Sequence, residues 1–403
     1  MKSPEKSTTF PRSERHPWSA RTDFGPPSSD FARLKERFLQ HPIPLDLTCT
    51  NPGQVDLPLP DFTRLLSETS TNTYRPSSRG SESARAAIAQ SLAPRAKIST
   101  SDILLTASTS EAYSFLLHAL CDPGDSIVVP RPSYPLFFQL SQIAGVNIVP
   151  FDITYDGAWH LALESLPSKR EIQEKRIRAI MVVSPNNPTG NSLSEHELRK
   201  LRHLELPLII DEVFRPYVHD ESRNHKEREL DADPLVAHDS SDLTIFVDGL
   251  SKRSCAPGLK LGWIIALGRD APSLFSRLEW LSDSFLSVNA QVQEALPAIL
   301  KEEPATQDIV RSRLSKNVAL VHEKFSGTSA TPLQSAGGWS IIVQFPNTQS
   351  EEKWWGEASD AGVWVQPGQI YSLPQPCAFV LSLLTPPKDF ALGLERLALL
   401  LNK

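Results

Sequence analysis

Lys252 is the side chain in this sequence whose position best suits chemistry. It ends the segment 248–252 (Asp-Gly-Leu-Ser-Lys), which follows the β-branched and apolar run 243–247 and precedes a Gly- and Pro-containing loop at 257–262. A strand that ends in a lysine and then turns sharply holds that lysine at the end of a sheet, where it can form an imine with a carbonyl group. A lysine after a strand can equally be solvated on a surface, so its interpretation depends on the residues upstream.

Polar side chains follow four other runs that have the pattern of strands. They are Ser108, Thr109 and Ser110 after 103–106, Tyr134 after 126–129, Asn187 after 179–183, and Asp211 after 206–210. Ligands in open parallel sheets bind beyond the carboxyl ends of the strands. The hydroxyl residues open a predicted helix, where backbone N–H groups and the helix dipole suit a phosphate. The sequence therefore predicts that an anion cradle, an aromatic ring, an amide, a carboxylate and a lysine converge on one edge of a sheet.

Each of these residues also has a purely structural interpretation. Asp211 could cap a loop, the Asn-Pro pair at 187–188 is an ordinary turn signal, and Tyr134 could be a core aromatic residue. The histidines, among them His160 and His203, have no metal-ligand spacing and are interpreted as structural or surface residues. The functional interpretation therefore rests on the whole ordered set and not on any one member.

Pyridoxal phosphate is a cofactor that needs all of these groups. It requires a lysine for its imine, an acid at its ring nitrogen, a phosphate cradle and a stacking partner. The motifs Asn-Pro-Thr-Gly at 187–190, Asp-Glu-Val-Phe at 211–214 and Ser-Lys at 251–252 occur in that order. In this respect the sequence resembles the fold-type I pyridoxal-phosphate enzymes of the class I/II aminotransferase family, over roughly residues 45–400.

The resemblance implies a role for each matching residue. Lys252 resembles the Schiff-base lysine, which also moves a proton between the substrate Cα and the cofactor, and Asp211 resembles the partner of the ring nitrogen. Asn187 matches the amide that bonds the phenolic oxygen of the cofactor, and Tyr134 matches the aromatic residue that stacks on its ring. The cofactor implied is pyridoxal 5'-phosphate, and no metal site is implied.

A second group of residues matches the phosphate site of the family. Its members are Ser108, Thr109, Ser110, Ser251 and Lys260. Tyr74 resembles the tyrosine that reaches the phosphate of a neighbouring subunit. This match implies a homodimer with shared active sites.

Three positions around the lysine and the aspartate depart from the family pattern. Gly249 stands where a serine is expected, and Lys260 stands where an arginine is expected, which keeps the charge but loses the bidentate fork. Phe214 replaces a tyrosine, so one hydrogen bond to the phenolic oxygen is lost and Asn187 is expected to be its main partner. Losing a donor to the phenolate should disfavour the deprotonated form.

A fourth departure concerns the substrate. Val380 stands about where the family carries an arginine that clamps the α-carboxylate. We expect either another cation or a different mode of acid binding, because charge-assisted pairs contribute strongly to binding. The candidate cations by neighbourhood are Arg75, Arg131, Arg253 and Lys260.

The order of strand and helix patterns predicts an α/β protein. Short β-branched runs alternate with helical patterns between residues 103 and 267, which predicts a three-layer α/β/α large domain with a mostly parallel sheet. A smaller α+β C-terminal domain, joined by the N-terminal segment, is expected to follow. The expected division is an N-terminal arm and part of the small domain at 1–44, a large cofactor-binding domain at 45–285, and the small domain at 286–403. Separate helices are predicted at 291–300 and 309–325.

Composition and charge narrow the class of protein. The 403 residues are 40% hydrophobic and 22% charged, with a net charge of −6 and no long basic run, which argues against nucleic acid and anionic membrane surfaces as partners. The longest apolar runs are far too short to cross a bilayer, and no apolar segment follows the basic residues of the N-terminus. Four scattered cysteines argue for a reducing compartment and against a zinc site, so a cytoplasmic protein is expected.

Three hypotheses for function follow from these observations. The first is a pyridoxal-phosphate-dependent aminotransferase that moves an amino group from an amino acid to a 2-oxo acid. The second keeps the cofactor but changes the reaction to that of a lyase, decarboxylase or cyclase, because Phe214 and Val380 alter the cofactor's electronics and the anchoring of the acid group. The third is a cofactor-binding module without turnover, for which residues 1–45 are too short and too Pro-rich to supply a helix-turn-helix.

Overall fold

The computed structural model describes residues 18–25, 29–69, 75–218, 232–238 and 241–401. Its largest element is an eight-stranded sheet whose strands, in spatial order, are β2 (Ile103–Thr106), β9 (Gly262–Leu267), β8 (Thr244–Gly249), β7 (Leu208–Asp211), β6 (Ile177–Val183), β3 (Ser126–Arg131), β4 (Asn147–Tyr155) and β5 (Trp159–Leu161). The pairs from β8 through β4 are parallel. Strand β9 runs antiparallel to both of its neighbours, and β5 runs antiparallel to β4. The mostly parallel sheet that the sequence predicted is confirmed.

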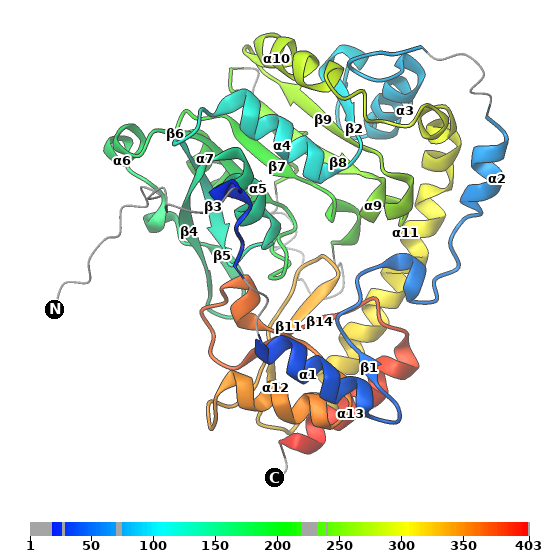
Figure 1. Cartoon of the computed structure of the whole chain (residues 1–403), viewed down its shortest axis with the longest axis vertical. Helices are drawn as coiled ribbons and strands as arrows, with labels where there is room; N and C mark the ends of the chain where they lie inside the picture. The colour runs from blue at the N-terminus through cyan, green and yellow to red at the C-terminus, as the bar shows by residue number, and fades with distance from the viewer. Residues whose placement is uncertain (1–17, 26–28, 70–74, 219–231, 239–240, 402–403) are drawn as a thin grey trace.

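Helices cover both faces of this sheet because its strands are apolar on both sides. Leu104 belongs to the core on one face, and its neighbours Ile103 and Leu105 belong to the core on the other. The first face is covered by α4 (Thr109–Leu120), α5 (Leu136–Ala144) and α10 (Ala271–Asp283), and the second by α3 (Glu82–Leu92), α7 (Glu195–Arg202) and the first part of α11 (Ala290–Phe325). Two shorter helices, α2 (Phe62–Ser67) and α6 (Lys169–Glu174), also belong to the unit built on the large sheet. The three layers are visible in Figure 1.

The second unit is built on a four-stranded antiparallel sheet. Its strands are β10 (Thr331–Pro332), β11 (Ser340–Gln344), β14 (Ala378–Ser382) and β13 (Gln366–Pro367), and it carries helices α12 (Glu351–Asp360) and α13 (Pro387–Leu400). The N-terminal segment joins this unit: α1 (Ser29–Gln40) packs on α12, and β1 (Leu45–Asp46) pairs in parallel with β12 (Val363–Trp364). The predicted small α+β domain with an added N-terminal segment is therefore confirmed.

Helix α11 corrects one expectation. The sequence predicted two helices, at 291–300 and 309–325, but the structure has one helix of 36 residues that contains Pro297 and Pro304. A proline removes one backbone hydrogen bond and favours a bend without necessarily ending a helix. Packing outweighs that cost here, because Leu296 is buried in the core of the large sheet and Leu314 in the core of the small one.

The domain limits at 44/45 and 285/286 stay predictions, since α11 contributes to both cores. The polar segment 219–239, which follows the fifth predicted strand and its Asp-Glu-Val-Phe motif, falls largely outside the described residues. Among the residues that the structure describes, no helix is long and apolar enough to cross a membrane.

Candidate active site

A cavity of about 390 Å³ lies where the carboxyl ends of the large sheet's strands meet the small unit. It is lined by the predicted residues Ser108, Thr109, Ser110, Tyr134, Asn187, Asp211, Phe214, Ser251, Lys252 and Lys260. Tyr74, the remaining predicted site residue, lies outside the described part of the chain. Segments separated by some 150 residues in the sequence thus meet at one cavity, as expected for strands that run in the same direction.

Lys252 sits on the four-residue helix α9 (Leu250–Arg253), which follows β8 directly. Its side chain is half-buried, and its Nζ lies 5.1 Å from the ring centroid of Trp339. The backbone carbonyl of Lys252 accepts a hydrogen bond of 2.8 Å from the Tyr217 hydroxyl, which holds the helix in place. Burial lowers the pKa of Lys252, because the charged ammonium loses hydration. Lys252 therefore has a larger fraction of the free amine, which is the nucleophilic form, than an exposed lysine has.

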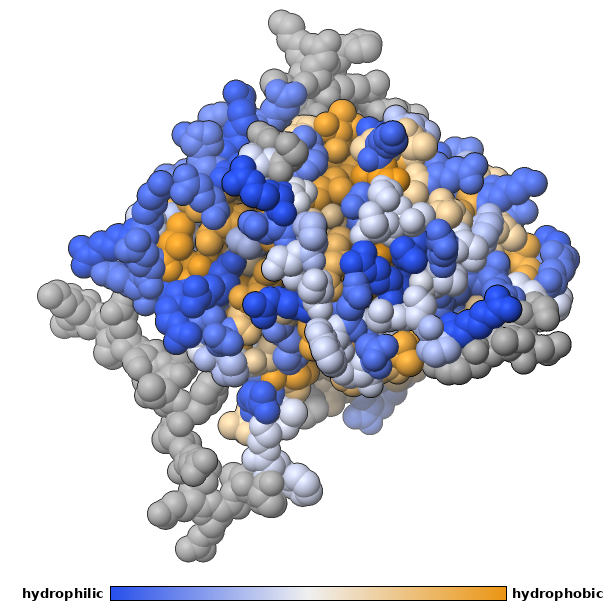
Figure 2. Space-filling model, turned by 90° about the horizontal axis from the view of Figure 1, so that it is seen from above, coloured by the Kyte–Doolittle hydropathy of each residue, from blue (hydrophilic) through white to orange (hydrophobic). Residues whose placement is uncertain are grey.

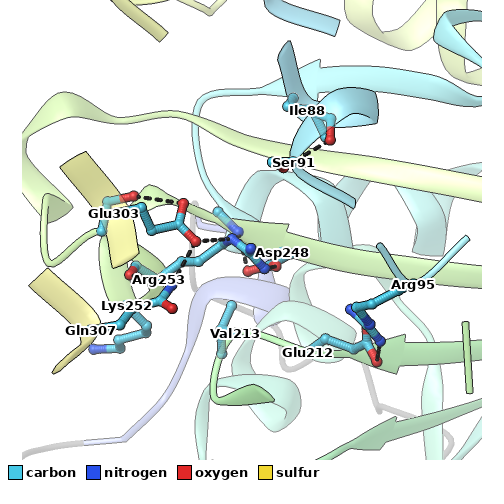
Figure 3. A network of polar contacts seen from close by, with 12 residues as sticks. Ile88, Ser91, Arg95, Glu212, Val213, Asp248, Lys252, Arg253, Glu303 and Gln307 are labelled. Carbon is cyan, nitrogen blue, oxygen red and sulfur yellow. Dashed lines mark hydrogen bonds and ion pairs between the residues drawn. The ribbon is translucent and has the colours of Figure 1, made fainter. Parts of the chain in front are cut away.

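An ion-pair network lies behind the lysine. Arg253 places its NH1 2.9 Å from Asp248 and its Nε 2.7 Å from Glu303 of α11. Gln307 donates to both Glu303 Oε1 and the Arg253 carbonyl (Figure 3). The network connects α9 to the long helix. The Arg253 side chain is 11% exposed, and its ion pairs with Asp248 and Glu303 hold it outside the cavity.

Asp211 ends β7 and is fully buried at the floor of the cavity. Its Oδ1 accepts a hydrogen bond of 2.8 Å from the Val213 backbone, and its Oδ2 accepts one from the Tyr113 hydroxyl. Burial raises the pKa of Asp211 to about 7, and the negative charges of Asp248 and Glu212 act in the same direction. Hydrogen bonding alone does not offset the loss of hydration, so this carboxylate is suited to a positively charged partner.

Glu212, the acidic residue next to Asp211, is paired with an arginine that lies outside the cavity. Arg95 forms a two-bond contact with Glu212, at 2.8 and 3.0 Å (Figure 3). It forms a second two-bond contact with Asp233. Burial raises the pKa of Glu212, and the charge and hydrogen bonds of Arg95 offset part of that rise. The network anchors the segment after β7 to the end of α3.

The predicted anion cradle is the N-terminus of α4. Ser108 caps the helix by accepting a hydrogen bond of 3.1 Å from the Glu111 backbone, which leaves the first N–H groups of the helix beside the cavity. Ser251 and the exposed Lys260 line the same cavity. Gly262 permits this arrangement, because a Cβ there would lie 3.0 Å from the backbone of both Ser108 and Thr109. This combination of N–H groups, hydroxyls and a cation suits a phosphate.

Three further predicted residues complete the floor and the walls. The Oδ1 of Asn187 is buried and accepts no hydrogen bond from the residues that the structure describes. Tyr134 is 42% exposed at the cavity, and the ring of Phe214 packs edge-on against Trp339. An amide end without a partner and an exposed aromatic face are both suited to a bound ligand.

The sequence interpretation missed the residues that the small unit and the N-terminal segment contribute. Thr48, Thr50, Trp339, Ser340, Gln366 and Tyr371 all line the cavity. The Tyr371 hydroxyl donates a hydrogen bond of 2.6 Å to Gln366 Oε1. It also missed Tyr113, because its helical spacing with Leu116 and Leu117 is typical of a side chain on an apolar helix face. Only the Gly- and Pro-flanked short strands at 338–344 and 366–367 could have hinted at the small-unit residues.

Val380 and the suggested cations can now be placed. Val380 is buried in β14, in register with Ile342 on one side and with Gln366 on the other. Arg131 pairs with Asp152, and Arg75 lines a separate small cavity. Together with the committed Arg253, this leaves Lys260 as the one suggested cation that lines the main cavity.

The cavity fits pyridoxal phosphate on the evidence of these side chains. The α4 N-terminus with Ser251 and Lys260 suits its phosphate, buried Asp211 suits a protonated ring nitrogen, and the unpaired amide of Asn187 suits its phenolic oxygen. Lys252 supplies an amine with a lowered pKa. No cluster of three or more metal-binding side chains occurs among the described residues.

Comparisons with known proteins agree with this geometry. Residues 53–385 match a family model described as aminotransferase class I and II. The chain is 32% identical over 245 residues to nicotianamine aminotransferase 1 of Oryza sativa subsp. japonica, covering 57% of this chain and 46% of that relative. It is 26% identical over 327 residues to the tyrosine aminotransferase of Dictyostelium discoideum, covering 75% of each. The first of these matches thus spans about half of the relative's length.

Solved structures share the fold at low sequence identity. An alanine aminotransferase from Pyrococcus furiosus superposes with a TM-score of 0.81 at 21% identity, covering 92% of this chain and 95% of that one. An aminotransferase from Escherichia coli superposes with a TM-score of 0.80 at 23% identity, covering 96% and 99%. At these identities the likeness establishes a common architecture.

Proposed function

The chain belongs to the aminotransferase class I and II family, and from that premise we propose that it is a pyridoxal-phosphate-dependent transaminase. It would move an amino group from an amino acid to a 2-oxo acid. The observation that carries the proposal is the meeting of Lys252, Asp211, Asn187 and the α4 N-terminus around one cavity. These four features come from distant parts of the chain, and a purely structural role for each would not require them to meet.

When bound, pyridoxal phosphate would supply an aldehyde that takes up the amino group and a protonated ring that accepts the electron pair released at the donor carbon. Lys252 would hold its aldehyde carbon and Asp211 its ring nitrogen. Asn187 would bind the phenolic oxygen, Tyr134 would lie against the ring, and the phosphate would occupy the α4 N-terminus with Ser251 and Lys260. Phe214 presents no hydroxyl, so Asn187 would be the main partner of the phenolic oxygen.

The proton transfer would be the work of Lys252. When a donor amine takes the place of Lys252 on the cofactor, the freed ε-amino group could take the proton from the α-carbon of the donor. It could then return that proton to the cofactor's aldehyde carbon. Its lowered pKa, caused by burial, keeps a fraction of the amine neutral and able to accept that proton. The Tyr217 hydrogen bond and the Arg253 network hold α9 in position while the side chain moves.

The acid group of the substrate would be bound mainly by neutral groups. Gln366, Tyr371, Ser340 and Trp339 line the cavity from the small unit, and the buried Trp339 Nε1 has no hydrogen-bond partner among the described residues. With the Oε1 of Gln366 engaged by Tyr371, its NH₂ end is left to bind a ligand oxygen. Such donors hold a carboxylate more weakly than a guanidinium does.

We also propose a homodimer in the cytoplasm. Trp280 of α10 is 80% exposed and Phe285 just beyond it is 67% exposed, which is unusual for large apolar side chains. Figure 2 views the molecule from above, the side where α10 lies, and shows hydrophobic surface among hydrophilic residues. All four cysteines are unpaired, which supports a reducing compartment.

A half-reaction screen tests the proposed function. Purified protein loaded with pyridoxal phosphate is mixed with single amino acids, and the absorbance of the cofactor is followed as it converts to the pyridoxamine form. A transaminase converts with at least one donor and is restored by a 2-oxo acid. Release of ammonia or carbon dioxide without that conversion would instead favour the lyase or decarboxylase alternative, and a broad panel that gives neither would count against both.

A further inference from the structure

The contact between Tyr113 and Asp211 is a feature of the site that the proposed chemistry has not used. Tyr113 lies on α4, one turn beyond the anion cradle, and its hydroxyl donates a hydrogen bond to Asp211 Oδ2. The side chain is 2% exposed, and its ring packs edge-on against Phe137 at a centroid distance of 5.0 Å. The same helix therefore supplies both the anion cradle and a donor to the Asp211 carboxylate.

We propose that Tyr113 is a positioning residue for Asp211, which fixes the orientation of its carboxylate and favours its ionised form, the form that can hold a cationic ring nitrogen. The inference rests on the proposed function, because Asp211 has this task only if the cofactor is bound there. The Tyr113 hydroxyl donates a hydrogen bond to Oδ2 of Asp211, and the Val213 backbone N–H donates one to Oδ1. The plane of the carboxylate is thereby set by two donors from different elements.

The phenol matters because the surroundings of Asp211 otherwise disfavour its charge. Burial is the largest effect that raises its pKa, and the hydrogen bond from Tyr113 is the largest effect that lowers it. The phenol itself stays protonated, since burial and the neighbouring carboxylate raise the pKa of Tyr113 well above its ordinary value. Tyr113 thus acts as a fixed donor throughout the working pH range and does not compete as an anion.

Other charged groups around Asp211 are balanced from outside the cavity. Asp248 on β8 is paired with Arg253, and Glu212, the next residue along the chain, is paired with Arg95. Lys252 on α9 faces the carboxylate across the cavity, and the phenol of Tyr134 lies before α5. Among these groups, Tyr113 is the side chain that donates a hydrogen bond directly to Asp211 within the described residues.

The variant Tyr113→Phe removes the hydroxyl and keeps the ring that packs on Phe137. The first measurement uses the apoprotein, with carbon-labelled aspartate, and follows the NMR signal of Asp211 against pH. We expect the pKa of Asp211 to move above its wild-type value of about 7. An unchanged titration would overturn the proposal, and this readout requires neither cofactor nor activity.

The second measurement is the affinity for pyridoxal phosphate as a function of pH. We expect Y113F to bind the cofactor about tenfold more weakly at pH 7, since a hydrogen bond to a charged group is lost, and to recover as pH rises above the new pKa. A loss of equal size at every pH would show a merely structural role and would contradict the proposal. In the background of Asp211→Asn, Y113F should cause no further pH-dependent loss.

Tyr155→Phe is the matched control, because the Tyr155 hydroxyl accepts a hydrogen bond from the Gln334 backbone outside the cavity. It should leave both the Asp211 titration and the pH dependence of affinity unchanged. If wild-type protein binds no pyridoxal phosphate at all, the proposed function fails, whereas the apoprotein titration still decides the effect of Tyr113 on Asp211. The two failures are therefore distinguishable.

Discussion

Asp211 illustrates how burial at the site costs folding free energy. Its folded pKa of about 7 lies above the ordinary aspartate value of 3.8, so between these pH values the folded chain holds a proton that the unfolded chain has released. The contribution of Asp211 to stability therefore becomes more unfavourable as pH rises from about 4 to 7, and it levels off above pH 7. Below about pH 4 the carboxyl is protonated in both states and carries no such penalty.

The variant Asp211→Asn should remove this pH dependence. In the apoprotein, we expect D211N to gain stability relative to wild type as pH rises from 4 to 7, by up to about 4 kcal/mol. Urea unfolding at several pH values measures the difference, in which other titrating groups cancel. A stability difference that stays constant with pH would show that Asp211 is ionised throughout and that its pKa is not raised.

Val380 and its neighbours lead to a prediction about donor preference. Each charge-assisted hydrogen bond contributes about 1.5–3 kcal/mol, so a two-bond clamp favours an amino acid over the matching amine by roughly a hundredfold or more. With neutral groups in its place, we expect phenylalanine and phenethylamine to have kcat/KM values within about tenfold of each other in the half-reaction. A larger preference for the amino acid would reveal a cation that binds the acid group.

A pair of arginine variants sharpens this comparison. Gln366 lines the cavity in register with Val380, so Gln366→Arg should raise the preference for the amino acid by about tenfold or more. Gln344 lies on the same small sheet but does not line the cavity, and Gln344→Arg should leave the ratio unchanged. A Q366R protein with the wild-type ratio would argue that this corner does not meet the substrate.

How far single residues could be predicted depends on what surrounds them. Lys252, Asp211 and Asn187 could be placed from sequence, because each follows a short apolar strand and parallel strands end at a common edge. Tyr113 could not, because its spacing on α4 matches that of core residues and only the packing shows its hydroxyl meeting Asp211. Trp339 could not be predicted as a site residue, because long-range packing decides which residues of the small unit contact the large sheet.

The elements show the same contrast between local pattern and packing. Most strands and helices agree with their sequence patterns to within a few residues, whereas one continuous helix, α11, replaces the two helices predicted at 291–300 and 309–325. Gly249 is explained only by the fold: it pairs with Gly262 across β8 and β9, and a Cβ there would lie 2.9 Å from Gly262 Cα. The serine expected from the family pattern would therefore push these strands apart.

The link between α9 and α11 gives a prediction about Glu303. Its side chain is buried against Arg253, and Glu303→Gln would leave the guanidinium with Asp248 as its remaining ionic partner. We expect a loss of about 1.5–3 kcal/mol in the free energy of unfolding, since a charge-assisted hydrogen bond to the buried guanidinium is replaced by a weaker one from a neutral amide. Glu302→Gln, an exposed neighbour with the same chemistry, serves as the control for urea unfolding. Equal stability of the two variants would contradict this account of the network.

The whole molecule carries the prediction of a homodimer. If the exposed residues Trp280 and Phe285 form the contact between subunits, Trp280→Glu should shift the protein from dimer to monomer in sedimentation experiments. The same variant should bind the cofactor more weakly. Leu399→Glu is the control, because Leu399 is 59% exposed on α13 of the small unit. A wild-type protein that sediments as a monomer at micromolar concentration, yet turns over fully, would exclude shared active sites.

The assignment of Lys252 as the residue that holds the cofactor has the most direct test. The protein is incubated with pyridoxal phosphate, reduced with borohydride to make the link permanent, and digested for peptide mapping by mass spectrometry. The account predicts one phosphopyridoxyl group, on Lys252, and none when Lys252→Ala is treated in the same way. A modification found on Lys260 or on scattered surface lysines, with Lys252 unmodified, would contradict it.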